Sequence, residues 1–112
     1  MTLSLERSMS ALEFRSGLSL AQMKQALEEA GKRPWHFGDS EWHGDYLGGS
    51  LSPQTVLRIY AMKGCYRAVL RFVSETGDAR AWEKFMGAQK LLLQTILPLI
   101  HAESIQPAEP LG

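Results

Sequence analysis

The sequence predicts an α+β protein: a two-layer sandwich of ferredoxin-like arrangement with an extra strand or hairpin, in which two helices pack on one face of a mostly antiparallel sheet. Two stretches with helical periodicity flank a segment rich in β-branched and aromatic residues. A short extended run precedes the first helix and another follows the second. The length of 112 residues predicts one domain over 1–106, followed by a flexible tail at 107–112.

The charged residues balance, because 12 lysines and arginines stand against 12 aspartates and glutamates. Nucleic-acid binders and solvating acidic chains both depend on a large field of one sign, so the balance argues against both classes. Cys65 is the only cysteine, and Glu6 and Arg7 lie where a secretion signal needs an apolar run. The apolar stretch 91–100 has about half the length that spans a bilayer. We therefore expect a cytoplasmic protein with no membrane partner.

The first helix is the clearest element in the chain. Residues 10–15 alternate in polarity and predict a short strand before it. Ser19 and Gln22 have the spacing of a capping box, and Gly31 is a suitable C-terminal stop. Apolar residues recur between them at helical spacing: Leu20, Met23, Leu27 and Ala30. The sequence therefore predicts a helix over 19–31.

Residues 34–47 contain too many glycines and aromatic side chains for a helix and predict a hairpin with a four-residue turn at 38–41. This turn would place His36 directly opposite His43. Gly48-Gly49-Ser50 would then form a flexible joint before the next strand.

A second hairpin is predicted from two strand-like runs, 54–62 and 65–74, which Lys63-Gly64 separates. A two-residue loop pairs Met62 with Cys65, and every later pair follows by counting outward. One face then collects buriable residues only: Thr55, Leu57, Ile59, Ala61, Tyr66, Ala68, Leu70 and Phe72. The other face collects all three arginines of the hairpin, so we expect one core face and one wetter face.

The second helix is expected over 79–97, with Asp78 as its cap and Pro98 ending it. Residues 99–105 would return to the sheet. The helix carries apolar groups in more directions than one sheet contact requires. A homodimer through this helix or through an edge strand is one prediction, and burial against the first helix and the last strand is the alternative.

The segment 35–46 holds the densest set of functional residue types. Histidines at 36 and 43 in opposed positions would have Cβ atoms about 5 Å apart, close enough to share a metal ion with a carboxylate. The pattern lacks the fixed ligand spacings of known zinc modules, so core or edge aromatics with solvated charges are the favoured interpretation. The functional alternative is a partner-binding surface, because Trp and Tyr beside acids are typical of binding hot spots. Its candidate residues are Asp39, Glu41, Trp42, Asp45 and Tyr46.

The arginine-bearing face is the second candidate site, for an anion or another ligand. Its members are Arg58, Tyr60, Arg67 and Arg71. Binding of RNA to this face is an alternative, although such sheet faces present two or three aromatics and only Tyr60 is well placed here. The structural interpretation is a surface ladder in which Glu41 and Asp45 neutralise the arginines, worth about 0 to 1 kcal/mol per pair.

The leading functional hypothesis is a small cytoplasmic protein-binding module, such as an inhibitor, an immunity-type protein or an adaptor. It would bind a basic protein partner through the exposed acidic and aromatic hairpin. No catalytic motif and no cofactor are indicated, so the sequence leans away from an enzyme. The alternative is a small ligand- or metal-binding protein or enzyme with a pocket near His36, His43 and Arg67. Nucleic acid is the less favoured partner.

Overall fold

A computed structural model describes residues 9–31, 33–41, 44–52, 55–72 and 79–108. The elements in chain order are β1 (Met9–Arg15), α1 (Leu20–Ala30), β2 (His36–Ser40), β3 (Gly44–Ser52), β4 (Thr55–Ala61), β5 (Tyr66–Phe72), α2 (Ala79–Leu91), the π-helical η2 (Leu92–Ile96), α3 (Leu97–Leu99) and β6 (Glu103–Ala108). The α+β class is confirmed, as is the antiparallel sheet.

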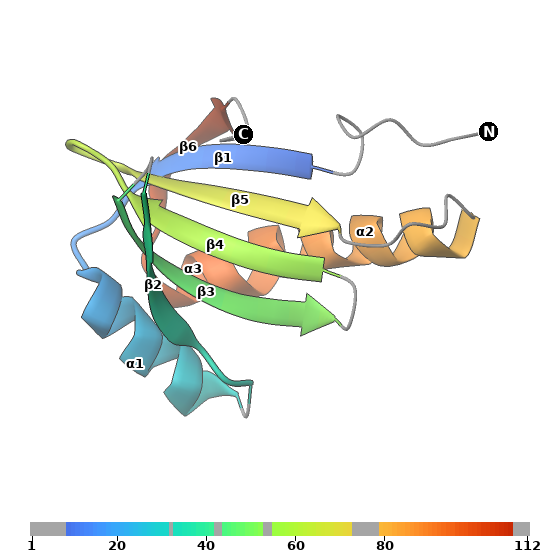
Figure 1. Cartoon of the computed structure of the whole chain (residues 1–112), viewed down its shortest axis with the longest axis horizontal. Coiled ribbons are helices and arrows are strands. Elements are labelled where there is room, and N and C mark those ends of the chain that lie inside the picture. Colours follow the sequence, from blue (N-terminus) through green and yellow to red (C-terminus); the bar gives the residue numbers. More distant parts are fainter. Residues whose placement is uncertain (1–8, 32, 42–43, 53–54, 73–78, 109–112) are drawn as a thin grey trace.

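The six strands form one sheet in the order β2-β3-β4-β5-β1-β6 (Figure 1). All five neighbouring pairs are antiparallel. The four strands from β2 to β5 follow one another as a meander, while β1 lies between β5 and the last strand. The edges of the described sheet are therefore β2 and β6.

The predicted register of the β4–β5 hairpin is confirmed. Arg58 lies opposite Val69, and Leu57 lies opposite Leu70. The Met62 N–H donates to the Cys65 carbonyl at 2.9 Å, and Gly64 in the two-residue loop has φ +82°. Glycine adopts this left-handed conformation without steric cost, which suits it to a tight hairpin turn.

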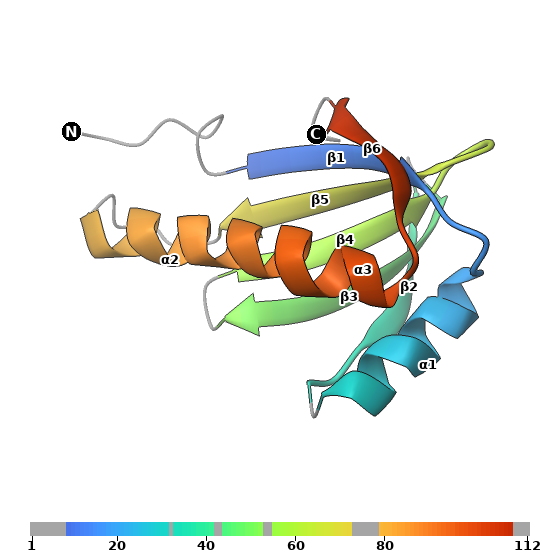
Figure 2. The same cartoon turned by 180° about the vertical axis from the view of Figure 1, so that it is seen from behind.

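The two faces of the sheet differ as expected. The core face carries fully buried strand residues: Phe14, Leu47, Leu57, Ile59, Ala68 and Leu70. Helix α1 adds Met23 and Leu27 to this cluster, and the second helical stretch adds Phe85, Ala88, Leu92, Ile96 and Leu97. Figure 2 shows α2 in front of the sheet, whereas Figure 1 shows the opposite face with no labelled helix in front of it. We call this second face the open face.

The second helical stretch continues past the expected stop at Pro98. Residues 92–96 form a π-helical stretch, and Pro98 then lies in the first turn of α3. The Leu97 N–H donates to the Leu92 carbonyl, so Pro98 directly follows a π-helical hydrogen bond inside a continuous helical stretch. Prolines inside helices are commonly accompanied by such local departures from the α-helical hydrogen-bond pattern. The expectation that Pro98 ends the helix is thus wrong, because the stretch runs two residues past 97, to Leu99. The last strand, β6, ends at Ala108 and so includes two residues of the segment expected as a tail.

The first hairpin of the meander has a different register from the one expected. Ser40 pairs with Gly44, so the connection is 41–43 and not 38–41. Residues 42 and 43 lie outside the described part of the chain. Gly44 has φ +80°, which suits a short connection that ends in a left-handed residue. Every residue pair of this hairpin therefore differs from the pair expected from the sequence.

The expected flexible joint at Gly48-Gly49-Ser50 is also wrong, because these residues lie inside β3. A Cβ built on Gly49 would lie 2.7 Å from Cε3 of Trp35. On the other face, a Cβ on Gly48 would lie 3.1 Å from Nε2 of His36. The two glycines therefore allow side chains from outside β3 to lie flat on the strand.

Candidate functional site

Two acidic side chains of the β2–β3 hairpin, Asp39 and Asp45, lie on its core-face side. Asp39 and Asp45 are direct cross-strand partners, and both are exposed. Glu41 follows the end of β2 and is exposed as well. Phe37 shares the face of Asp39, and 54% of its surface is accessible. We call these four residues, Phe37, Asp39, Glu41 and Asp45, the acidic hairpin surface.

A groove separates this surface from helix α1. It has a volume of about 490 Å³ and is lined by Ala21, Lys24, Gln25, Glu28, Glu29 and Phe37. Lys24 donates to Glu28 at 2.7 Å, and its ammonium lies 5.8 Å from the centre of the Phe37 ring. Both glutamates of the groove have a partner on α1, since Glu28 is paired with this lysine and Glu29 accepts from the Gln25 amide at 3.2 Å.

The carboxylates of the acidic hairpin surface form no ion pair within the described residues. The ion pairs there join Lys24 to Glu28 and Arg67 to Glu13. Neither Asp39 nor Asp45 takes part in them. Like charges directly opposite each other on a sheet are destabilising, so this arrangement costs free energy in the isolated chain.

Tyr46, expected as part of the partner-binding surface, lies on the other side of the sheet. Its ring is 5.4 Å from the ring of Tyr60, and the guanidinium of Arg58 lies 4.5 Å from its centre. A Cβ on Gly38 would overlap the Tyr46 ring, which explains the glycine at that position of β2. The structure thus separates Tyr46 from Asp39 and Asp45. Trp42, the remaining expected member, lies outside the described residues.

The arginines of β4 and β5 share the open face, as predicted. The acidic residues that were expected to neutralise them do not lie on this face. Asp45 lies on the core face, opposite Asp39, and Glu41 lies beyond the end of β2. The residue beside Arg67 is Glu13 of β1, which is its cross-strand partner at 3.7 Å. The predicted ladder therefore does not form, because β1 and not β3 supplies the carboxylate next to β5.

On the same face, Arg58 and Tyr46 form a small cluster around Tyr60. An Arg58 N–H donates to the Tyr60 oxygen at 3.4 Å, and this hydrogen bond raises the pKa of Arg58. Tyr60 is only 5% exposed, so its ring offers little surface on which a base could stack. Arg71 is exposed near the end of β5.

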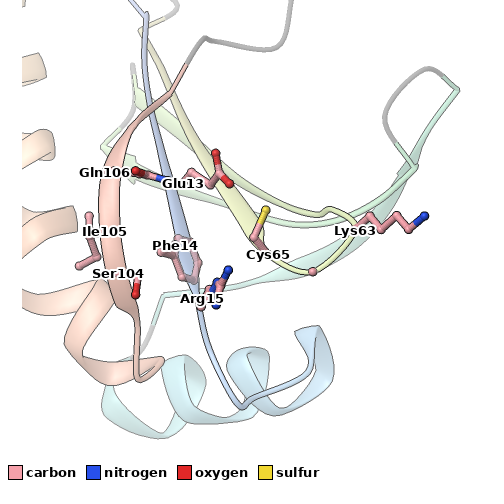
Figure 3. A pocket seen from close by; sticks show the side chains of 9 residues that line it. Glu13, Phe14, Arg15, Lys63, Cys65, Ser104, Ile105 and Gln106 are labelled. Atoms are coloured by element: carbon pink, nitrogen blue, oxygen red, sulfur yellow. The ribbon is translucent and has the colours of Figure 1, made fainter.

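A pocket of about 550 Å³ lies where β1, β6 and the turn of the β4–β5 hairpin meet (Figure 3). It is lined by Glu13, Phe14, Arg15, Lys63, Gly64, Cys65, Ser104, Ile105 and Gln106. Lys63 extends away from the other labelled side chains in Figure 3. Burial raises the pKa of the Cys65 thiol, and the neighbouring Glu13 raises it further. The thiol is therefore held in its protonated, less nucleophilic form.

The expected pairing of His36 with His43 is wrong, since His36 lies opposite Gly48. His43 lies outside the described residues. Within the described part of the chain, no three His, Cys, Asp or Glu side chains are grouped as metal ligands. Arg67, the third residue of the expected ligand pocket, is two strands away from β3, on β5.

The sequence reasoning did not single out two residues of the candidate surfaces, Phe37 and Glu13. Phe37 was expected to face a residue across a four-residue turn, and its large exposure follows from its place on an edge strand. Glu13 could have been found from its position, because it shares a face of β1 with Ala11 in the alternating run 10–15. That run did not indicate which strand would be its neighbour.

In comparisons with known proteins, no family model matches the chain, and no curated protein matches it. Among the described helices, none combines the length and apolar character of a membrane span.

Proposed function

We propose that the protein is a small binding module that recognises a basic segment of a partner protein through the acidic hairpin surface. The observation that carries this proposal is the pair Asp39 and Asp45. These two carboxylates face each other on an exposed hairpin, and neither forms an ion pair with another described residue. A lysine or arginine from a partner would relieve the repulsion between them. Phe37, beside them, supplies an apolar contact of the kind found at binding hot spots.

The arginine-bearing face is less suited to the same role. Arg58 is held by Tyr46 and Tyr60, and Arg67 is held by Glu13. An anion would have to compete with these intramolecular contacts. We therefore place partner binding on the acidic hairpin surface, ahead of anion, metal or RNA binding.

The proposal also includes a ferredoxin-like arrangement, a cytoplasmic role and self-association. A ferredoxin-like arrangement with an added hairpin is supported by the position of β1 between β5 and β6 and by the shared core of both helical stretches. An inhibitor or adaptor role in the cytoplasm agrees with the single free cysteine. Self-association through α2 stays a prediction, supported by the exposure of Met86 and Leu93, which lie two turns apart.

The test compares two double variants that change the net charge equally. Binding of a lysine-rich peptide is followed at low ionic strength for Asp39→Asn/Asp45→Asn and for Glu83→Gln/Glu103→Gln, whose acids lie on α2 and β6. We expect the first pair to slow association by about tenfold, because steering depends on charges near the binding surface. The second pair should have a much smaller effect. Equal effects would show that only net charge matters and would contradict the proposal, as would the absence of binding to the unmodified protein.

A further inference from the structure

The acidic hairpin surface lies on an edge strand of the sheet. Strand β2 is the first in the order β2-β3-β4-β5-β1-β6, so within the described residues one side of its backbone has no neighbouring strand (Figure 1). Such an edge presents N–H and C=O groups that can pair with another extended chain. All five residues of β2 keep a regular antiparallel register with β3. The outer side of β2 therefore has the geometry that strand addition requires.

The opposite edge, β6, is protected in ways that β2 is not. Its pairing with β1 shifts register between Glu13 and Arg15. Ser104 lies in the left-handed region with φ +52°, and Pro107 has no N–H to donate. Bulges and prolines are devices that prevent pairing at an edge. Only β2, of the two edges, combines a regular backbone with an adjacent groove.

The side chains near β2 indicate which residues an added strand would carry. A strand beside β2 would place alternate residues opposite Phe37 and Asp39, on the side of the groove. An apolar residue fits the first position, and a lysine or arginine fits the second. Asp45, the cross-strand neighbour of Asp39 on β3, adds to the preference for a basic residue at that position.

The same charges argue against a second copy of this protein as the occupant. Pairing of β2 with β2 would bring two acidic hairpin surfaces together, each with Asp39, Glu41 and Asp45. Like-charge groups at an edge disfavour such self-pairing. A basic chain is therefore favoured over a homodimer at this edge.

We propose that β2 binds an extended basic segment of the partner as an additional antiparallel strand, with a lysine or arginine opposite Asp39 and an apolar residue two positions later opposite Phe37. This inference rests on the proposed function and specifies the partner as a strand-forming peptide with a basic and an apolar residue two positions apart, on one face of the strand. The carboxylates select the sign of the peptide, and the outer backbone edge of β2 at Phe37 and Asp39 defines where it lies.

The experiment uses a peptide of Lys-Thr-Val-Thr repeats, which places lysine and valine in turn along one face of a strand, and a peptide of the same composition with the lysines and valines in separate blocks. A third peptide carries backbone N-methyl groups along the edge that would pair with β2. Affinity is measured by fluorescence anisotropy, and amide NMR shifts locate the contact. We expect the Lys-Thr-Val-Thr peptide to bind most tightly, with shifts at residues 36–40, and N-methylation to weaken binding at least about tenfold through loss of backbone hydrogen bonds.

Two exposed edge residues provide matched variants. Phe37→Ala should weaken binding about fivefold, whereas Ile105→Ala on β6, which removes a similarly exposed side chain, should leave it unchanged. Binding that is equal for all three peptides, but still lost in Asp39→Asn/Asp45→Asn, would overturn strand addition and leave the proposed function standing. Shifts that map to β6 or α2, or a dimer paired through β2, would also overturn it. Failure of every peptide to bind would remove both proposals.

Discussion

At the scale of single residues, the positions without side chains shape the β2–β3 hairpin. Trp35 is buried and lies against the strand at Gly49, while His36 and Tyr46 occupy the space above Gly48. A side chain at either position would displace a ring. The glycines, read alone, suggest flexibility, but the aromatic residues at 35 and 46 explain why they belong in a strand.

Gly49→Ala is accordingly expected to lower the free energy of unfolding by about 1–3 kcal/mol, because the added methyl group meets the Trp35 ring. Gly17→Ala is the control, since a Cβ there meets nothing within 4 Å. It should change stability by less than about 0.5 kcal/mol. Urea unfolding of both variants measures the difference. Equal stabilities would mean that Trp35 does not pack tightly on this strand.

At the scale of elements, local signals specify α1 and the β4–β5 hairpin. Ser19 accepts from the Gln22 N–H at 3.2 Å, and the Gln22 side chain accepts from the Ser19 N–H at 2.9 Å. The capping box read from the sequence is therefore confirmed. The register of the β4–β5 hairpin was predictable because its two-residue loop leaves one pairing that buries the apolar set.

Ser19→Ala should destabilise the protein by about 1 kcal/mol, because it leaves a donor of the first helical turn without its partner. Ser50→Ala, at an exposed position of β3, serves as the comparison and should have little effect. Thermal unfolding followed by circular dichroism measures both. A Ser19→Ala variant as stable as the parent would show that packing of Met23 and Leu27 alone determines the start of this helix.

At the scale of the whole molecule, the zero net charge conceals a separation of charge. The arginines of β4 and β5 lie on the open face, and Asp39 and Asp45 lie on the core-face side of the β2–β3 hairpin. Glu13 offsets part of the arginine charge by pairing with Arg67. Two patches of opposite sign therefore remain on one small domain, and this arrangement supports binding rather than neutralisation within the fold.

This separation predicts opposite effects for two single substitutions. Asp39→Asn should raise the free energy of unfolding by about 0.2–1 kcal/mol at low ionic strength, because it removes a like-charge pair. The gain should shrink in high salt, where the charges are screened. Glu13→Gln should lower it by about 0–1 kcal/mol through loss of the partly exposed contact with Arg67. Salt-dependent urea unfolding measures both, and a loss of stability in Asp39→Asn would contradict the assignment of a costly pair.

Local patterns in the sequence were sufficient for the helical stretches, for the β4–β5 register and for the division of its residues between two faces. These features follow from the periodicity of helices and strands, which a short window already contains. Tertiary structure alone decided that Glu13 accompanies Arg67, that Asp45 faces Asp39, and that β2 forms an edge. The physical reason is that strand order brings distant segments together, and side-chain alternation indicates a face but not the neighbouring strand.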